Sequence, residues 1–388
     1  TTGDPKAGMY TSRNIIASAK YLPDAIGLTR NDFYVCFLPL AHIAERLVGH
    51  FIRFISGHPA AFAESIEDMP QNIRQTGPTI VFGTPRVWEK FYARIMTGIG
   101  DATWIQKKLF HWAINVGKEN CEIRESGKTP GLGMNVRLRI AKFLIHDKIK
   151  DIFGGKIRTI LTGAAPISRE IIHFFNWVGL DVYEAYGMTE TSGVITIQSE
   201  GKTKIGSVGI PIPGTELKIL EDGEICCRGE QNIQGYYKNE EATNELLKPD
   251  GEGGFWLHTG DVGHIDEEGY LFITDRKKDI IITSGGKNVA PQNIENLMKT
   301  SPYISQAMVI GDKKSYLTIL VTLDEDEITK FARDRTILYQ DLGDLTKKEE
   351  VIDLLNHVIK EKNIELASYE SIKKFRILEE ELDQDKDE

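Results

Sequence analysis

A polar turn at residues 186–193 carries the side chains best suited to chemistry in this sequence. It follows an apolar segment, 180–185, that predicts a strand, and it contains Thr189, Glu190, Thr191 and Ser192. Hydroxyls can donate to phosphate oxygens, and Mg²⁺ commonly takes one or two carboxylates together with substrate phosphates. The turn therefore predicts a phosphate and cation site with Glu190 as the metal ligand. On spacing alone, a capped loop that opens a helix is the favoured explanation of the same residues.

Three further segments have the composition of ligand-binding loops. Residues 1–6 supply hydroxyls, a glycine and an ammonium group, although Met9 and Tyr10 stand where a Walker A loop requires Lys and Ser or Thr. Residues 259–261, Thr-Gly-Asp, predict a tight turn at the start of a hairpin, with a carboxylate that can accept from a ribose diol. Residues 284–288 contain two adjacent glycines and permit close backbone approach. A flexible end, a turn cap and a hairpin turn are the simpler explanations.

Two single residues are candidates on weaker grounds. His42 lies one helical turn from Arg46, although a lone histidine is more often structural than catalytic. Arg276 lies in the charged run 275–279, where its planar fork can reach a ribose or a phosphate. A solvated charge run in a linker is the alternative for Arg276.

The overall composition limits the classes of partner. The 388 residues suffice for two or three domains, and the net charge of −10 argues against a nucleic-acid partner. Four scattered cysteines, without a CxxC pattern, favour a reducing compartment. No apolar run approaches 18 residues. We expect a cytoplasmic protein, and we leave peripheral membrane contact and the oligomeric state open.

The first half of the chain alternates predicted strands with predicted helices. Such alternation indicates a mostly parallel, covered sheet of the α/β class, with ligands beyond the carboxyl ends of the strands. The clearest unit is a strand at 158–162, a helix at 166–178 begun by Pro166, and a strand at 180–185. The other predicted strands are 33–38, 60–63 and 79–82, and the other predicted helices are 14–21, 43–57, 85–96 and 102–150, the last broken at 129–131.

After about residue 206 the pattern changes to hairpins. The turns 221–223 and 266–269 join strands at 216–220, 224–228, 262–265 and 270–274, which predicts an antiparallel β subdomain. We place a large domain at 1–275, with its β-rich subdomain at 206–275, and a smaller, mobile α+β domain at 276–388. That second domain is expected to be incomplete. Its predicted elements are strands at 280–283, 307–311 and 317–323, and helices at 291–299 and 351–366.

Taken together, the motifs resemble one superfamily in order and in type. The sequence has TTGDPK at 1–6, GAAP at 163–166, YGMTE at 186–190, TGD at 259–261 and DRKKD at 275–279. This set is similar to the adenylate-forming (ANL-type) enzymes, which include acyl-CoA synthetases, luciferases and peptide-synthetase adenylation domains. The segments 37–42, 84–90, 256–261 and 284–291 look like the long-chain acyl-CoA synthetases, and both the bubblegum-type and the bacterial groups look close.

The resemblance implies a two-step ligase that uses ATP, Mg²⁺ and coenzyme A. A fatty-acid carboxylate attacks the α-phosphate of ATP, and the coenzyme A thiol then displaces AMP. Carried over by motif, the catalytic residues would be Lys6, His42, Thr189 and Glu190, with Glu190 on the metal. The ATP and coenzyme A residues would be Thr1, Thr2, Gly3, Gly163, Ala164, Ala165, Glu184, Ala185, Tyr186, Gly187, Met188, Asp261, Ile273, Arg276, Lys278, Gly285, Gly286 and Asn288.

Within that set, Tyr186 would stack on adenine, Asp261 and Arg276 would take the ribose, and Lys278 would be a hinge. The Gly285–Gly286 loop would enter the site for thioester formation. An acyl tunnel in the large domain is also implied, with Trp88 as a candidate for its wall.

Three departures from the family pattern lead to further expectations. The portion that usually precedes the phosphate loop is absent, Ala7 replaces a usual glycine, and the motif that carries the adenylation lysine has no counterpart. We therefore expect this chain to be a fragment of a longer protein, and we expect the fragment itself to be deficient in adenylation. Substantial pyrophosphate exchange by this chain would contradict the second expectation. A ligase for an aryl or shorter acid and a non-catalytic nucleotide or acyl binder are the alternatives.

Overall fold

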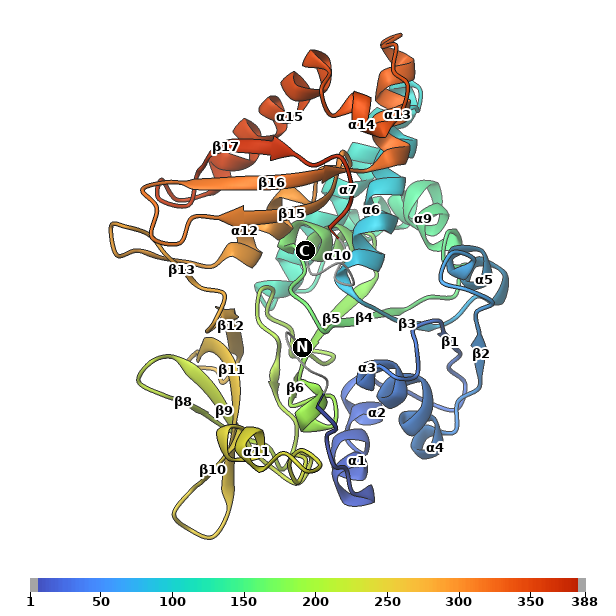
Figure 1. Ribbon diagram of the computed structural model, residues 1–388. Coiled ribbons are helices and arrows are strands. Elements are labelled where there is room, and N and C mark those ends of the chain that lie inside the picture. The colour runs from blue at the N-terminus through green and yellow to red at the C-terminus, as the bar shows by residue number, and fades with distance from the viewer. Residues whose placement is uncertain (1–5, 383–388) are drawn as a thin grey trace. The chain divides into compact units, whose positions relative to one another are not determined.

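The computed structural model describes residues 6–382, which group into two compact units (Figure 1). The first unit contains the residues up to Trp88 and Gly98–Thr274, and the second contains Glu89–Thr97 and the residues from Asp275 onward. The Thr1, Thr2 and Gly3 predictions lie outside the described residues.

The first unit is built on a mixed sheet with the order β2-β1-β3-β4-β5-β6-β7. The strands β2, β1, β3, β4 and β5 are parallel neighbours, whereas β6 and β7 are antiparallel. The strands are β1 (Tyr34–Cys36), β2 (Ala60–Phe62), β3 (Ile80–Gly83), β4 (Thr159–Gly163), β5 (Asp181–Tyr186), β6 (Thr196–Ile197) and β7 (Ile210–Pro211). The expected parallel, covered sheet is confirmed.

Helices cover this sheet because both of its faces are apolar. On one face, Leu22, Leu47 and Ile52 from the early helices pack with Tyr34, Phe82 and other strand residues. On the other, Trp88 lies edge-on to Phe175, with ring centroids 5.9 Å apart. The helices of this unit are α1 (Ser12–Ala19), α2 (Leu22–Ala25), α3 (Ile43–Glu45), α4 (Ile52–Ser56), α5 (Met69–Thr76) and α10 (Arg169–Trp177); a π-helical turn over Arg46–Phe51 joins α3 to α4. The helix α6 (Pro85–Gly100) begins and ends in this unit, and its residues Glu89–Thr97 are grouped with the second unit.

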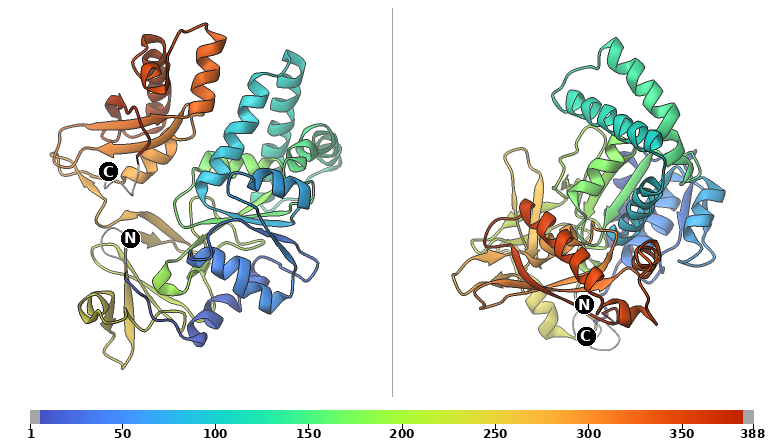
Figure 2. Two further views of the ribbon diagram at one scale, coloured as in Figure 1. Left: turned by 45° about the vertical axis from the view of Figure 1, so that its right-hand side comes forward. Right: turned by 90° about the horizontal axis from the view of Figure 1, so that it is seen from above.

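A helical hairpin lies between β3 and β4 in the sequence. It consists of α7 (Trp104–Glu125) and α8 (Leu132–Ala141), and a π-helical turn (Lys142–His146) continues α8 into α9 (Asp147–Asp151). Ala113 and Val116 of α7 pack on Met134 and Ala141 of α8. The break at 129–131 that the sequence predicted separates the two helices, which run side by side (Figure 2).

The predicted β subdomain is present, with the strand order β10-β11-β9-β8 and β12 paired to β11. Its elements are β8 (Glu216–Ile219), β9 (Glu224–Arg228), α11 (Glu240–Leu246), β10 (Leu247–Pro249), β11 (Phe255–Ile265) and β12 (Leu271–Arg276). The expected hairpins at 221–223 and 266–269 join β8 to β9 and β11 to β12.

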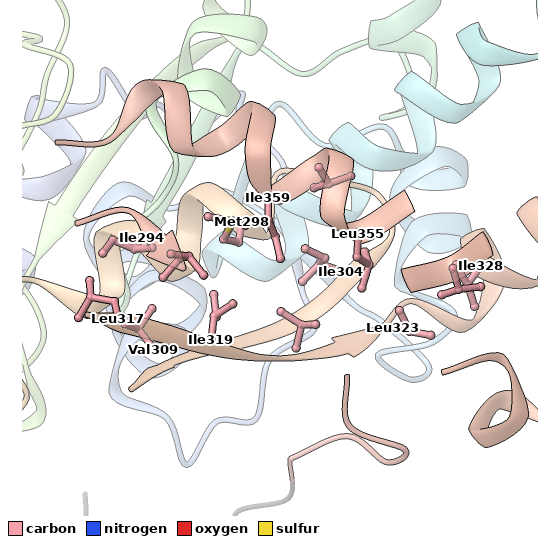
Figure 3. Packing of buried hydrophobic residues seen from close by; sticks show 14 of the residues in the cluster. Ile294, Met298, Ile304, Val309, Leu317, Ile319, Leu323, Ile328, Leu355 and Ile359 are labelled. Carbon is pink, nitrogen blue, oxygen red and sulfur yellow. The ribbon is translucent and has the colours of Figure 1, made fainter. Parts of the chain in front are cut away.

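The second unit contains a three-stranded sheet, β15-β16-β17, packed against helices (Figure 3). Ile294 and Met298 of α12 meet Leu317 and Ile319 of β16 in its core. Its elements are β13 (Ile281–Ile282), β14 (Asn288–Val289), α12 (Pro291–Met298), β15 (Ile304–Ile310), β16 (Leu317–Leu323), α13 (Glu325–Asp334), α14 (Leu342–Leu345), α15 (Glu349–Lys362) and β17 (Ile372–Ile377). The elements α13, α14 and β17 were not predicted.

Two local predictions were wrong. The helix expected at 166–178 begins only at Arg169, because the hydroxyl of Ser168 accepts from the Glu170 backbone N–H and caps it there, so Pro166 lies before its first turn. Residues 259–261 do not form a turn at the start of a hairpin. They lie inside β11, at a bulge where the register with β9 shifts and Gly260 adopts φ +73°.

Candidate active site

A hydrogen bond joins two of the predicted nucleotide residues from different sheets. The Tyr186 hydroxyl, at the end of β5, donates to Oδ2 of Asp261 over 2.6 Å. The β11 bulge turns Asp261 toward Tyr186, and Asp261 N–H donates to the Thr259 hydroxyl over 3.1 Å. Burial and the charge of Asp261 raise the pKa of Tyr186 well above its usual value, so the phenol remains the donor. The ring of Tyr186 packs with Ile195 and Cys227, and Ile273 packs against the same cluster.

The neighbouring strand ends carry buried polar atoms without partners. Thr162 of β4 lies opposite Glu184 of β5 in the parallel register. Both side chains are buried, and Thr162 Oγ1 and Glu184 Oε2 have no hydrogen-bond partner among the described residues. Burial raises the pKa of Glu184 to about 8, opposed in part by the charge of Arg169. Buried polar groups are normally paired, so this pair marks a place where a ligand can bind.

The loop after β4 exposes its backbone next to this pair. Gly163 lies opposite Ala185, and a Cβ on Gly163 would lie 2.6 Å from the Ala185 carbonyl oxygen. Ala164 adopts φ +69°, a conformation that non-glycine residues rarely take. Ala164 and Ala165 are exposed, so their peptide groups are accessible to a ligand beyond the strand ends.

The turn after β5 is tightly constructed. A Cβ on Gly187 would lie 1.7 Å from the Gly193 carbonyl oxygen, so only glycine fits there. The Met188 N–H donates to the Thr191 hydroxyl over 3.0 Å, and residues Thr189–Thr191 form one 3₁₀ turn. Ser192 donates to the Gln231 carbonyl over 2.7 Å. The turn is therefore fixed against the β subdomain.

Glu190 is held by a tyrosine that the sequence analysis missed. The Tyr236 hydroxyl donates to Glu190 Oε1 over 2.5 Å, and Lys6 Nζ lies 5.4 Å from the centroid of the same ring. Tyr10 donates to the Thr189 carbonyl over 2.6 Å, and burial and the Glu190 charge raise its pKa to about 12. Lys6, Thr189 and Glu190 are thus brought together. The only sequence signal for this tyrosine was the Gly-Tyr-Tyr segment at residues 235–237, and nothing in the sequence linked that segment to Glu190.

His42 has a structural role at the start of α3. Its Nδ1 accepts from the Ala44 backbone N–H over 3.2 Å, so Nε2 carries the proton in the neutral ring. The ring is exposed. Arg46 Nε donates to the Leu40 carbonyl over 2.9 Å, which fixes the segment before the helix. Trp88, in contrast, is fully buried and donates to the Gly83 carbonyl over 3.1 Å.

The other predicted residues belong to the second unit. Arg276 and Lys278 are exposed, and the neighbouring Asp275 is buried, with Oδ1 accepting from Arg276 N–H over 2.7 Å. Gly285, Gly286 and Asn288 lie in the exposed turn and second strand of the β13–β14 hairpin. Gly286 adopts φ +73° there, and Thr283 N–H donates to the Lys287 carbonyl over 3.0 Å. This segment is a hairpin turn with an accessible backbone.

Comparison with known proteins gives relatives for the whole chain. It is 36% identical over 383 residues to the long-chain-fatty-acid–CoA ligase FadD15 of Mycobacterium bovis, an alignment that covers 97% of this chain and 62% of that protein. It is 35% identical over 338 residues to human long-chain-fatty-acid–CoA ligase ACSBG1, covering 83% of this chain and 45% of that protein. The chain therefore spans less than two thirds of the length of these relatives.

Solved structures share the fold. The o-succinylbenzoate coenzyme A synthetase of Bacillus subtilis, solved in complex with AMP, matches with a TM-score of 0.62 and 25% identity, over 98% of this chain and 64% of that chain. The adenylation domain of a carboxylate reductase from Mycobacterium chelonae matches with a TM-score of 0.70 and 23% identity, over 98% of this chain and 54% of that chain. These likenesses confirm the expected adenylating-enzyme fold.

Two family models match the chain. The AMP-binding enzyme model matches residues 1–237, and the AMP-binding enzyme C-terminal domain model matches residues 278–386. The first match covers more than half of the sequence and contains the Tyr186 turn. The resemblance drawn from the motifs is thereby confirmed, and the chain belongs to the AMP-binding enzyme family.

Proposed function

We propose that this chain is part of an ATP-dependent ligase that joins long-chain fatty acids to coenzyme A through an acyl adenylate. The observation that carries the proposal is the Tyr186–Asp261 hydrogen bond, which joins the end of β5 to the β11 bulge. On the same strand, Oε2 of Glu184 has no hydrogen-bond partner among residues 6–382. The similarity to FadD15 and ACSBG1 supports the long-chain class of acid.

The strand ends offer groups that complement adenosine. Glu184 Oε2 lacks a partner within the part of the chain that the structure describes, and it would accept from the exocyclic amine of adenine. Tyr186 would stack on the base, with Gly163, Ala164, Ala165, Ala185, Gly187 and Met188 supplying backbone contacts. Asp261 would accept from the ribose hydroxyls, next to Ile273. A carboxylate can accept both hydroxyls of a diol, and Tyr186 holds this one in place.

The Tyr186 turn suits the phosphates and a hard cation. Thr189 would donate to the α-phosphate, Lys6 would pair with the outer phosphates, and Glu190 would bind Mg²⁺ together with phosphate oxygens. Thr1, Thr2 and Gly3 would complete the phosphate loop. When bound, Mg²⁺ neutralises phosphate charge and makes the α-phosphorus more electrophilic. Tyr236 occupies one oxygen of Glu190 and thereby orients the carboxylate.

The reaction then needs alignment more than acid–base chemistry. A carboxylate oxygen of the fatty acid bonds to the α-phosphorus, and the bond to pyrophosphate breaks. The coenzyme A sulfur next bonds to the acyl carbon, its proton passes to solvent, and AMP leaves. His42 Nε2–H would donate to the fatty-acid carboxylate, because Nδ1 is occupied by the Ala44 backbone. Arg276 would reach the ribose, Lys278 would be the hinge, and Gly285, Gly286 and Asn288 would enter for thioester formation.

The experiment compares acids of graded length. In the longest natural form of the protein, thioester formation with palmitate is expected to exceed that with benzoate and acetate by more than roughly tenfold in kcat/KM, since each buried methylene adds about 0.8 kcal/mol of binding. Equal or greater rates with benzoate or acetate would assign the enzyme to another carboxylic acid. ATP binding without thioester formation from any acid would favour a non-catalytic binder.

A further inference from the structure

The outer face of α8, continued by Phe143 in the π-helical turn that follows it, exposes a continuous apolar stripe. Leu132, Val136, Ile140 and Phe143 recur at intervals of four, four and three residues, and 87%, 59%, 45% and 77% of their surfaces are exposed. The inner residues Met134, Leu138, Ala141 and Ile145 pack on α7. This spacing places the four exposed residues on one side of the helix, opposite the packed side. The stripe is therefore not part of the core.

Cations flank this stripe, and acidic residues are absent from the segment that carries it. Residues 127–146 contain no Asp or Glu but include Lys128, Arg137, Arg139 and Lys142. Arg139 and Lys142 are exposed beside the stripe, whereas Arg137 pairs with Glu119 of α7 over 2.9 Å. Residues 104–150 as a whole hold ten Lys or Arg against four Asp or Glu, a net charge of +6, while the complete chain carries −10. The hairpin is thus oppositely charged to the chain as a whole.

We propose that this α8 face docks on the surface of an anionic lipid bilayer. A helix with large apolar side chains on one side and flanking Lys or Arg lies in the plane of the interface, with its apolar side among the acyl chains. The cations then meet lipid phosphates, which attract basic residues near the surface. A second copy fits less well, because a twofold contact through this face would bring the same cations together.

Among the described residues, none of the helices combines the length and the hydrophobicity needed to cross a bilayer. The proposed contact is accordingly peripheral. It stands apart from the proposed ligase activity, because its readout is vesicle binding in the absence of ATP, coenzyme A and fatty acid. Failure of either proposal leaves the other intact.

Vesicle flotation tests the docking. The chain is mixed with vesicles of phosphatidylcholine alone or of equal parts phosphatidylcholine and phosphatidylglycerol, at about 0.1 M salt, where charges act over ~10 Å. We expect binding to the anionic vesicles to be at least roughly tenfold tighter, and to weaken as salt is raised. The affinity of V136S/F143S for the anionic vesicles is expected to be lower by roughly tenfold or more. The affinity of R139E/K142E for them is expected to fall to the level that the unchanged chain shows for neutral vesicles.

Matched controls separate this face from general changes in hydrophobicity and charge. L338S/I364S removes two comparably exposed apolar side chains, 85% and 84% exposed, from the second unit, and K360E/K373E makes the same charge change there. Both controls are expected to bind within about twofold of the unchanged chain, with circular dichroism confirming that all variants fold. If V136S/F143S unfolds, R139Q/K142Q replaces it.

Four results would overturn the proposal. The first is absence of binding to anionic vesicles, and the second is binding that the α8 variants leave unchanged. The third is a concentration-dependent dimer that V136S/F143S dissolves, which would assign the face to a second copy. A natural form longer than this chain is run in parallel. The fourth result is its failure to bind the anionic vesicles, which would assign the face to an internal segment of the protein.

Discussion

Tyr236 donates a 2.5 Å hydrogen bond to Oε1 of Glu190, across 46 positions of sequence. The same ring lies 5.4 Å from Lys6 Nζ, so one side chain links the turn after β5 to the segment at Lys6. The contact leaves Glu190 oriented before any metal binds. Tyr236 therefore has a positioning role in the proposed phosphate site.

Replacing this tyrosine tests that role. Y236F removes the donor and frees the Glu190 carboxylate to rotate, so the affinity for Mn²⁺·ATP should fall about three- to tenfold, as expected for one hydrogen bond to a charged group. Electron paramagnetic resonance of Mn²⁺ in the presence of ATP measures the change. Y237F, at the exposed neighbouring residue, is the control. Unaltered Mn²⁺·ATP affinity in Y236F would show that Tyr236 does not position Glu190.

The Tyr186–Asp261 hydrogen bond leads to a prediction for the affinity of AMP. Y186F loses the donor that fixes Asp261, and AMP affinity should fall about five- to tenfold, equivalent to ~1–1.5 kcal/mol. D261A should lower the affinity for AMP by more than Y186F does, because it removes the ribose acceptor itself. Calorimetric titration with AMP measures both, and Y316F in the second unit is the control. AMP affinity that does not change in D261A would exclude this residue from the ribose site.

Glu184 predicts a pH dependence of stability. Its folded-state pKa is raised to about 8 by burial, above the ordinary value of 4.5 that it has in the unfolded chain. The stabilising contribution of the neutral carboxyl is fully present below pH 4.5 and is lost as pH rises toward 8. E184Q stays neutral, so its melting temperature relative to the unchanged chain should rise between about pH 5 and pH 8. A difference independent of pH would show that Glu184 ionises normally.

Nucleotide binding should also release a proton from Glu184. If adenine donates to Oε2, it favours the ionised carboxylate and lowers its pKa, so AMP binding at pH 7 should release up to about one proton. Calorimetry in buffers of different ionisation enthalpy counts that proton, and E184Q should abolish the release. Equal proton release by E184Q would place adenine elsewhere.

Gly187 tests the geometry of the turn. A Cβ there would lie 1.7 Å from the Gly193 carbonyl oxygen, so G187A must displace backbone. We expect a loss of at least ~2 kcal/mol in stability together with weakened ATP binding, measured by denaturant melts and calorimetry. G98A lies in helix α6, where an added Cβ would meet no atom within 4 Å beyond its chain neighbours and the adjacent helix backbone. It should be neutral or stabilising by up to ~1 kcal/mol. A fully stable, ATP-binding G187A would show that the turn adopts another shape.

The parts of this fold that depend on local pattern were predictable. The strands β4 and β5 and the hairpin turn between β8 and β9 follow from apolar runs and turn residues close together in the sequence. The start of α10 was misplaced because Pro166 and Ser168 are both helix-start residues, and the Ser168 cap prevailed. The Thr-Gly-Asp segment was misread because a glycine with positive φ suits a bulge as well as a turn.

Contacts between distant segments could not be predicted in this way. Tyr10 and Thr189 are 179 positions apart, and no spacing rule connects them. Glu184 Oε2 and Thr162 Oγ1 have no partner among the described residues, and this too is a property of burial in three dimensions. The motif resemblance supplied the residues of the candidate site, whereas the structure supplied the tyrosines that hold two of them.

The products of ATP consumption show whether the protein is an AMP-forming fatty-acid–CoA ligase. In the longest natural form of the protein, incubation with ATP, Mg²⁺, coenzyme A and palmitate is followed by chromatography of nucleotides and thioesters. We expect one AMP and one pyrophosphate for each palmitoyl-CoA, with palmitoyl-CoA formation abolished in E190A. Formation of ADP and phosphate, or AMP release without a thioester, would contradict this expectation.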